Sequence, residues 1–341
     1  MKKYLLTEIP HNTLNAGYKA KNDIRTVLKN EGFSAVDIAE TFKFDKIPEY
    51  FKLIKNLLSL EKGSELVIQW PIYSFFNSKF MPLFLSVLES KEFKIILVIH
   101  DLESVRFASD EKSKALEKRI LDLSQKIIVH NDFMKSFLCE NLGLGAKKPV
   151  SLGIFDYLCD KVSKERSLEG GVCLAGNLDP NKSGYIYKLG SLDAVELNVY
   201  GGNFDEKLAS KSINYKGSFQ PHELPQNLEG AFGLVWDGNS IDTCEGITGQ
   251  YLKINNPHKT SLYLASGLPV IIWSEAALSP FIEKNNLGFS VSSLDEISTK
   301  LNGMTSDDYE LMLSNVKKIG AHLRRGAFIK GAIKKCEEEI V

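Results

Sequence analysis

Apolar residues along this chain gather in short runs, and these runs alternate with longer stretches in which apolar and polar residues recur at helical spacing. This alternation is typical of parallel sheets whose strands are connected by crossover helices. In the first half it predicts strands at residues 3–8, 34–39, 65–69, 94–100 and 126–130. Helical patterns lie between them, near residues 20–31, 47–60, 78–90, 112–124 and 132–142. The hydrophobic pattern therefore predicts an α/β fold.

The alternation is interrupted once and then begins again. At residues 142–149, glycines and a proline end the preceding helix, so we place a boundary near 150–165. Further strands are predicted at residues 171–175, 195–201, 213–217, 232–236, 269–273 and 288–291, followed by a helical pattern over 306–339 that is interrupted around Gly320 and Gly326. We predict two Rossmann-like domains, 1–155 and 156–310, and a C-terminal helical segment, 311–341, that can pack back on the first domain.

Length and charge narrow the class of partner. A chain of 341 residues is long enough for two domains of ordinary size. Its 42 basic and 43 acidic residues give a net charge of −1, so no overall field attracts a polyanion. We therefore expect no nucleic-acid partner, and any anion must be bound by a local cluster.

Cysteine usage and the apolar runs predict the compartment. The cysteines are odd in number, scattered and without a C-x-x-C pair, so neither a disulfide framework nor a zinc site is indicated. The first apolar run breaks at Thr7-Glu8, too early for a signal peptide, and no run approaches the roughly 18 to 20 residues of a transmembrane helix. We predict a cytoplasmic protein that at most lies on the inner face of a membrane.

The most informative segment for chemistry is 251–273. Asn256 suits an N-cap and Pro257 the first helical position, so a helix is predicted to begin there and to end at Gly267. Lys259 and Thr260 then lie in its first turn, where backbone N–H groups and the helix dipole favour an anion. A lysine there opposes the dipole, which suggests an anionic ligand as its counter-charge. The same residues also fit an exposed lysine on an ordinary capped helix.

A second candidate is the loop at 176–184, which follows a predicted strand. Loops at the carboxyl ends of strands are where open α/β sheets bind ligands. Asn177 and Lys182 lie in this loop, and Lys182 is predicted to meet a diphosphate from the side opposite Lys259. The alternative is a surface turn, because Asp-Pro-Asn-Lys is a common turn sequence.

The first half offers two further candidates. Gly17 and Tyr18 lie in a segment of small and polar residues, 9–23, that lets a backbone approach a ligand. His100 and Asp101 follow directly on a strand, and Asp101 is placed to remove a proton from an acceptor hydroxyl. Alternatively, Asp101 only caps the segment that follows.

Other polar and aromatic groups follow strands of the second half. Tyr215 is a candidate to cover a base, and Asp237 and Asp242 are candidates to bind sugar hydroxyls. No Asp-x-Asp pair stands at a strand end, so no metal and no other cofactor is expected. The aromatic stretch 70–84 is interpreted mainly as core, with an acceptor site or a lipid contact as the alternative.

In this order, the segments resemble a family of bacterial GT-B glycosyltransferases. The family includes β-1,6-galactofuranosyltransferases of O-antigen assembly and, more distantly, the second glucosyltransferase that extends glycans on serine-rich-repeat adhesins. The matching segments are 99–101 (Ile-His-Asp), 154–157 (Ile-Phe-Asp-Tyr), 175–177 (Ala-Gly-Asn), 232–238 (Phe-Gly-Leu-Val-Trp-Asp-Gly) and 255–264 (Asn-Asn-Pro-His-Lys-Thr-Ser-Leu-Tyr-Leu). The last two look closer to the galactofuranosyltransferase branch.

The resemblance implies a GT-B fold, two Rossmann-like domains facing across a cleft, and a function. A UDP-sugar, most closely UDP-galactofuranose, is the expected donor, and a lipid-linked or protein-linked glycan is the acceptor. Transfer is expected to invert the anomeric centre without a metal, with Asp101 as the base. By position, the resemblance implies that Lys182 and Lys259 clamp the diphosphate, that Tyr215 lies beside the nucleotide, and that the Gly17 loop and Asp101 face the donor or acceptor. With the residues predicted above, the expected donor-binding set is Gly17, Asn177, Lys182, Tyr215, Asn256, Lys259 and Thr260, and the expected acceptor or sugar contacts are His100, Tyr18, Asp237 and Asp242.

Other readings stay open at this point. The adhesin branch makes a glucosyl- or N-acetylglucosaminyltransferase an alternative, and it suggests homo-oligomers. A sugar-nucleotide 2-epimerase shares the architecture and also binds UDP. A non-enzymatic partner subunit of a glycosyltransferase complex is an alternative from another functional class.

Overall fold

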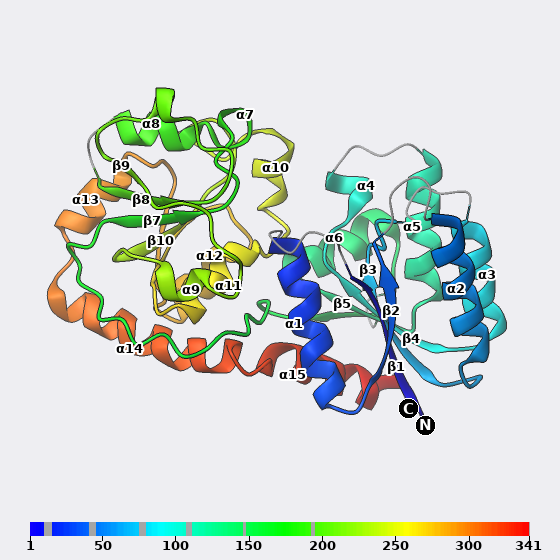
Figure 1. Cartoon of the computed structure of the whole chain (residues 1–341). Helices are drawn as coiled ribbons and strands as arrows, with labels where there is room; N and C mark the ends of the chain where they lie inside the picture. The colour runs from blue at the N-terminus through cyan, green and yellow to red at the C-terminus, as the bar shows by residue number, and fades with distance from the viewer. Residues whose placement is uncertain are drawn as a thin grey trace. The chain divides into compact units, whose positions relative to one another are not determined.

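The computed structural model describes residues 1–9, 16–40, 46–74, 80–106, 111–145, 148–191 and 195–340. The chain divides into two compact units, drawn in Figure 1: Met1–Phe155 together with Gly326–Val341, and Asp156–Arg325. Each unit is built on a parallel sheet with helices around it, so the predicted α/β class is confirmed.

The first unit has a six-stranded sheet in the order β2-β1-β3-β4-β5-β6. Its strands are β1 (Lys3–Ile9), β2 (Ser34–Ala39), β3 (Glu65–Trp70), β4 (Lys94–Ile99), β5 (Lys126–Val129) and β6 (Pro149–Ser151). Its helices are α1 (Ala16–Asn30), α2 (Lys46–Ser59), α3 (Met81–Ser90), α4 (Glu103–Arg106), α5 (Glu111–Leu123), α6 (Asp132–Leu142) and α15 (Ala327–Ile340). Helices α1 and α15 cover one face, and α2, α3 and α5 cover the other (Figure 1). Because both faces are covered, a central strand such as β4 is apolar on both sides.

The second unit has another six-stranded sheet, in the order β12-β11-β10-β7-β8-β9. Its strands are β7 (Val172–Ala175), β8 (Leu197–Tyr200), β9 (Ile213–Tyr215), β10 (Phe232–Val235), β11 (Val270–Trp273) and β12 (Gly288–Val291). Its helices are α7 (Pro180–Ser183), α8 (Tyr185–Ser191), α9 (Leu224–Asn227), α10 (Gly246–Tyr251), α11 (His258–Ala265), α12 (Ser279–Lys284), α13 (Glu296–Asn302) and α14 (Ser306–Leu323), with a 3-10 turn at Glu206–Leu208.

In both sheets the chain starts in the middle and later crosses to the other side. The strand order therefore reverses between β1 and β3 in the first unit, and between β7 and β10 in the second. Open parallel sheets bind ligands at the carboxyl ends of the strands beside such a reversal. The topology therefore marks one candidate edge in each unit.

The C-terminal part differs from the single segment predicted at 311–341. Helix α14 belongs to the second unit and runs through Gly320 without a break, while α15 belongs to the first. The break falls at Gly326, whose φ is +70° and where a Cβ would come within 2.3 Å of the Val27 side chain on α1. Glycine at this position thus ends one helix and lets α15 pack closely on α1.

Candidate functional site

Helix α11 begins at the candidate edge of the second unit. Its N-cap is Pro257, with ψ at 127° and no side-chain cap, so the prediction of Asn256 as N-cap was wrong by one position. Proline cannot donate an N–H, and its extended ψ places it outside the helix. The first turn still carries His258, Lys259 and Thr260, with the backbone N–H groups of a helix start directed out of its end.

The ammonium of Lys259 is held at the end of β10. Its Nζ donates to the Trp236 carbonyl oxygen at 2.8 Å and to Asp237 Oδ1 at 2.9 Å. The Lys259 and Asp237 side chains are 20% and 22% exposed, so the ion pair is largely but not fully removed from water. Asp237 therefore supplies the counter-charge to Lys259 that we had expected from an anionic ligand. An ammonium has three N–H donors, and these contacts use two of them.

Helix α11 is fixed to the sheet by Tyr263. The Tyr263 hydroxyl accepts a hydrogen bond from the Ala175 backbone N–H at 2.8 Å, at the end of β7. A Cβ on Gly233 of β10 would lie 2.2 Å from the Tyr263 ring, so only glycine allows this approach. Burial raises the pKa of the Tyr263 phenol well above its usual value, and the hydroxyl stays neutral. These contacts fix where the first turn of α11 lies.

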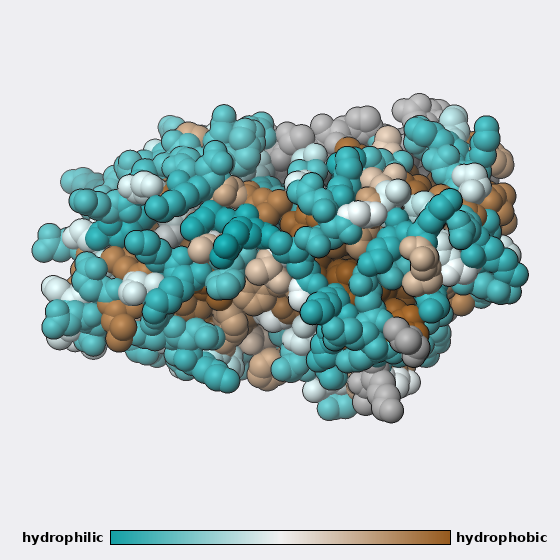
Figure 2. Space-filling view, turned by 90° about the horizontal axis from the view of Figure 1, so that it is seen from below, coloured by the Kyte–Doolittle hydropathy of each residue, from teal (hydrophilic) through white to brown (hydrophobic). Residues whose placement is uncertain are grey.

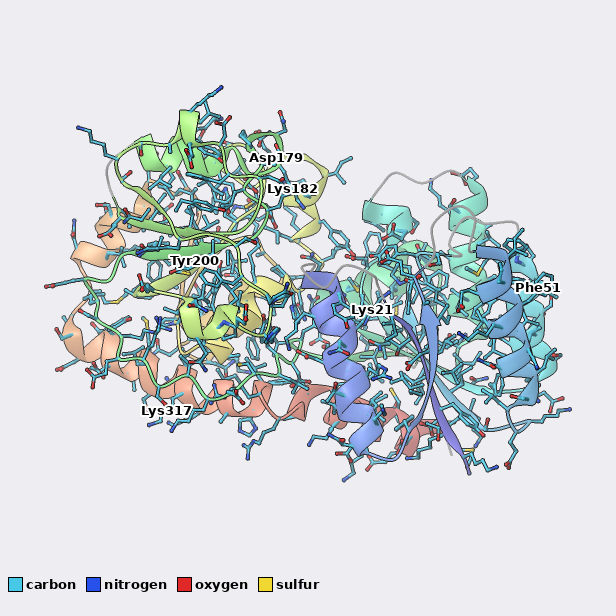
Figure 3. The ribbon with its side chains drawn as sticks, viewed as in Figure 1. Lys21, Phe51, Asp179, Lys182, Tyr200 and Lys317 are labelled. Carbon is cyan, nitrogen blue, oxygen red and sulfur yellow. The ribbon has the colours of Figure 1, made fainter. Side chains whose placement is uncertain are left out.

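The loop after β7 carries Lys182 to the same edge. Asn177 is exposed, and its Oδ1 accepts from the Asp179 N–H and the Asn203 amide, both at 3.0 Å. Lys182 lies in the short helix α7, exposed, and within the described part of the chain no ion pair or hydrogen bond is recorded for its ammonium. Figure 3 labels Asp179 and Lys182 in this loop.

The Lys182 and Asp237 loops are joined directly. Asn239 Oδ1 accepts from the Gly184 N–H at 3.0 Å, and the Asn239 amide donates to the Asn181 carbonyl at 3.3 Å. The structure therefore brings the β7 loop, the β10 loop and the start of α11 together where the strand order reverses. The predicted residues Asn177, Lys182, Asp237 and Lys259 all lie at this edge.

Three other predicted residues of this unit lie differently. Thr260 is completely buried and Asn256 is 4% exposed, so neither side chain reaches the surface at this edge. Within the described residues, no hydrogen-bond partner is recorded for the Thr260 hydroxyl. Asp242 is exposed, and its carboxylate accepts from the Ser240 hydroxyl at 3.3 Å.

Tyr215 ends the edge strand β9. Its ring stacks on Phe204 with centroids 4.5 Å apart, and its hydroxyl donates to the Gly201 carbonyl at 3.0 Å. The side chain is held in place yet remains 42% exposed. It can therefore offer a fixed aromatic surface at the carboxyl edge of the sheet.

In the first unit, Asp101 lies just beyond β4 and is partly buried. The Tyr73 hydroxyl donates to Asp101 Oδ2 at 3.2 Å. His100, predicted as an acceptor contact, is 8% exposed, and its Nε2 is hydrogen-bonded to Gln69 Oε1 at 2.8 Å. Its ring also stacks on Phe155, so in this arrangement His100 belongs to the packed interior.

The N-terminal candidates lie in a helix. Helix α1 begins at Ala16, four residues before the predicted start, so Gly17 and Tyr18 fall in its first turn rather than in a loop. The preceding residues, 10–15, lie outside the described residues.

Sequence reasoning missed a buried charged pair beside Asp101. Lys21 of α1 and Glu8 of β1 are 4% and 3% exposed, and Lys21 Nζ lies 3.7 Å from Glu8 Oε2. The helical spacing gives a signal in hindsight, because Lys21 occupies the same face as the buried residues Ile24 and Leu28. A lysine on an apolar helix face calls for a partner.

Two absences concern the described residues alone. Within them, no group of three or more histidine, cysteine, aspartate or glutamate side chains is arranged to hold a metal ion. In the same part of the chain, none of the helices has the length and apolar character needed to cross a bilayer.

Comparison with solved structures defines the fold. Over 98% of its length, the chain is similar to Anabaena Alr3699/HepE solved in complex with UDP, covering 99% of that chain with a TM-score of 0.61 at 12% identity. It is similar to an alpha-glucosyltransferase (AGT) in complex with UDP over 98% of its length and 99% of that chain, with a TM-score of 0.61 at 12% identity. The fold is that of the GT-B glycosyltransferases.

Sequence comparisons give the family. Residues 2–154 match the model of the Glucosyltransferase 3-like N-terminal domain, and residues 172–336 match that of the C-terminal domain. The chain is 32% identical to "Beta-1,6-galactofuranosyltransferase WbbI" of Escherichia coli (strain K12), over 99% of both chains. It is 26% identical to "Glucosyltransferase 3" of Streptococcus gordonii, over 91% of both. The chain belongs to the Glucosyltransferase 3-like family and is a glycosyltransferase, so the resemblance is confirmed.

Proposed function

We propose that this glycosyltransferase moves galactofuranose from UDP-galactofuranose to a hydroxyl of a glycan acceptor in polysaccharide assembly. The donor sugar rests on the similarity to a β-1,6-galactofuranosyltransferase over the full length. The use of UDP rests on the UDP complexes of the two structural relatives. A glucosyl donor is the alternative, because the streptococcal relatives carry the name glucosyltransferase.

The observation that carries the proposal is the pair of lysines at the β7–β10 edge. Within the described residues, two of the three N–H donors of Lys259 have acceptors, so we assign the third to the ligand, and Lys182 presents an ammonium from the neighbouring loop. Together with the N–H groups of the α11 start, they supply what a diphosphate requires. The second oxygen of Asp237 can then accept from a sugar hydroxyl, and Tyr215 can stack on the base.

In the reaction that we propose, the acceptor oxygen attacks the anomeric carbon while the bond from that carbon to the β-phosphate oxygen breaks. The Asp101 carboxylate takes the hydroxyl proton, and UDP leaves with the bonding electrons. Lys182, Lys259 and the helix start stabilise the developing charge on the phosphate, the role that a metal has in other transferases. Direct displacement of this kind inverts the anomeric centre.

A donor screen tests the proposal. Purified protein is incubated with an acceptor glycan and either UDP-galactofuranose, UDP-glucose or UDP-N-acetylglucosamine, with and without a chelator, and released UDP is measured. We expect release with UDP-galactofuranose that needs the acceptor and withstands the chelator. Release with UDP-glucose alone would favour the adhesin-type activity. Conversion of the donor without an acceptor would favour an epimerase, and no binding of UDP in calorimetry would favour a partner subunit.

We further propose contact with a membrane, which suits a lipid-linked acceptor in the cytoplasm. Ile47, Phe51 and Leu58 of α2 and Leu83 of the adjacent α3 are each about half exposed. Figure 2 shows hydrophobic surface at this end of the first unit, and Phe51 is labelled on α2 in Figure 3. Lys55 lies among these residues on the exposed face of α2 and suits an anionic lipid surface.

A further inference from the structure

Lys21 is enclosed at the candidate edge of the first unit. Its Nζ donates to the Pro71 carbonyl at 2.6 Å and lies 4.7 Å from the centroid of the Tyr73 ring. Figure 3 labels Lys21 on α1. Both contacts reach the segment that follows β3, one of the strands at the reversal.

Glu8 holds the same segment from the end of β1, the other strand at the reversal. Its two carboxylate oxygens accept from the Tyr73 and Ser74 backbone N–H groups at 2.9 and 2.8 Å. Lys21 and Glu8 thus fix the backbone on both sides of the Tyr73 side chain, and they stabilise each other as a buried ion pair.

Tyr73 connects this buried pair to the surface. Its side chain is 44% exposed, whereas Lys21 and Glu8 are almost completely buried. Its hydroxyl donates to Asp101 Oδ2 at 3.2 Å. A continuous set of contacts therefore leads from the interior of the unit to the carboxylate that we propose as the base.

The charge of Lys21 is costly where it stands. Burial lowers the pKa of its ammonium, while the carboxylates of Glu8, Asp101 and Glu103 raise it and partly offset that effect. An apolar side chain at this position would avoid the desolvation of an ammonium but would leave the buried Glu8 carboxylate without its ion-pair partner. Packing alone therefore does not account for a lysine here.

We propose that Lys21 and Glu8 are positioning residues that act through Tyr73, whose hydroxyl fixes the orientation of Asp101 and stabilises its ionised form. This inference rests on the proposed role of Asp101 in the transfer. Among the described residues, the Tyr73 hydroxyl from the segment after β3 donates to Asp101, and the carboxylates of Asp101 and of Glu103 on α4 both act on the Lys21 ammonium from α1. Donation from Tyr73 and the positive charge of Lys21 both favour the carboxylate, which must be ionised to take a proton.

The test is the pH dependence of kcat/KM for Tyr73→Phe and Lys21→Met, measured by UDP release between about pH 4.5 and 8.5. Loss of the hydroxyl or of the ammonium disfavours the ionised carboxylate, so the acidic limb moves to higher pH. We expect a shift of about half a unit or more and a kcat lowered by about tenfold, with KM for the donor little changed. Lys29→Met on the exposed side of α1 is the matched control and keeps the parent profile.

Asp101→Asn separates this inference from the proposed function. If Asp101→Asn is inactive while Tyr73→Phe keeps the parent kcat and acidic limb, the positioning role is wrong and the base assignment stands. If Asp101→Asn turns over normally, the base assignment and the positioning role both fail. If Lys21→Met fails to fold, the Tyr73→Phe variant alone tests the positioning role, because it keeps the partly exposed ring and loses only the hydroxyl.

Discussion

The two lysines of the donor edge are held differently, and we expect them to contribute differently to the reaction. Lys259 is fixed by the Trp236 carbonyl and Asp237, so it is preorganised for charge that develops on the leaving phosphate. Lys259→Met is expected to lower kcat by about a hundredfold or more, as for the loss of a preorganised donor. Lys182 is exposed, and Lys182→Met is expected mainly to raise KM for the donor, by about tenfold, and less at high salt. Lys211→Met controls for general charge, and equal kcat losses for both site lysines would contradict this distinction.

His130 provides a pH prediction at the residue scale. Burial lowers its pKa to about 4, from an ordinary value of 6.5. Between these values the unfolded chain takes up a proton that the folded one does not, so stability is lost as pH falls from about 6.5 to 4, by about 3 kcal/mol at most. His130→Gln is therefore expected to flatten the decline of the melting temperature over this window, with exposed His222→Gln as the control.

Glu65 also changes the stability of the fold over this pH range, so the His130→Gln variant must be compared with the parent protein at each pH. Burial and the Glu337 carboxylate raise its pKa to about 7, so its contribution to stability is present at low pH and is lost as pH rises to about 7. The stability contribution of Glu65 therefore changes with pH in the direction opposite to that of His130, over nearly the same pH range. The difference in melting temperature between His130→Gln and the parent protein at each pH isolates the contribution of the histidine. Identical pH profiles for the two proteins would count against a neutral, buried His130.

At the scale of elements, the close contact of α11 with the sheet is the feature on which the donor edge depends. Gly233→Ala would place a methyl group 2.2 Å from the Tyr263 ring, so α11 must shift. We expect a loss of about 1–3 kcal/mol in stability, typical of overpacking, and weaker binding of UDP in calorimetry. In helix α15, Gly331 has open space around its Cβ position, so Gly331→Ala should leave binding unchanged. Unchanged UDP affinity in Gly233→Ala would mean that the place of α11 does not determine binding.

Elements with a strong local pattern could be predicted from the sequence, and those that depend on distant contacts could not. The long apolar run of β4 carries its own signal and was found, and the Asn-Pro signal placed the start of α11 to within one residue. Strand β6 has three residues, too few for a periodicity. Lys21 and Glu8 were missed because their meaning comes from the Tyr73 segment, about fifty residues away from Lys21 along the chain, which no local pattern links to them.

At the scale of the whole molecule, the chain path makes the first unit depend on its last helix. Helix α15 packs on α1 and on β4, β5 and β6, and it buries Ile329, Ile333 and Cys336. Ion pairs from Lys3 to Glu337 and from Lys126 to Glu339 add to this contact. Removal of residues 326–341 should therefore expose a face of the first sheet and lower the melting temperature of that unit by about 10 °C or more, as expected for the loss of several buried side chains.

The second unit provides the internal control for this truncation. It comprises Asp156–Arg325 and holds the lysines of the donor edge, so UDP should still bind to the truncated chain. Hydrogen exchange in β4 and β5, compared with β7 and β10, would measure the two units separately. Equal protection of β4 in both chains would show that α15 is not needed for the first sheet.

The exposed face of α2 and α3 allows a test of membrane contact by the whole protein. Phe51→Ser with Leu58→Ser removes apolar side chains that are 60% and 52% exposed, so the fold should be retained while membrane affinity falls. We expect the parent to sediment with vesicles containing an anionic lipid and the variant to do so at least tenfold less. Lys211→Met in the second unit serves as the control. If the parent protein bound vesicles of neutral lipid but not vesicles with anionic lipid, the proposed attraction of Lys55 to an anionic surface would be contradicted. The parent protein could instead bind none of the vesicles and form dimers in light scattering. If the double variant were then monomeric, this face would be a contact between copies of the chain.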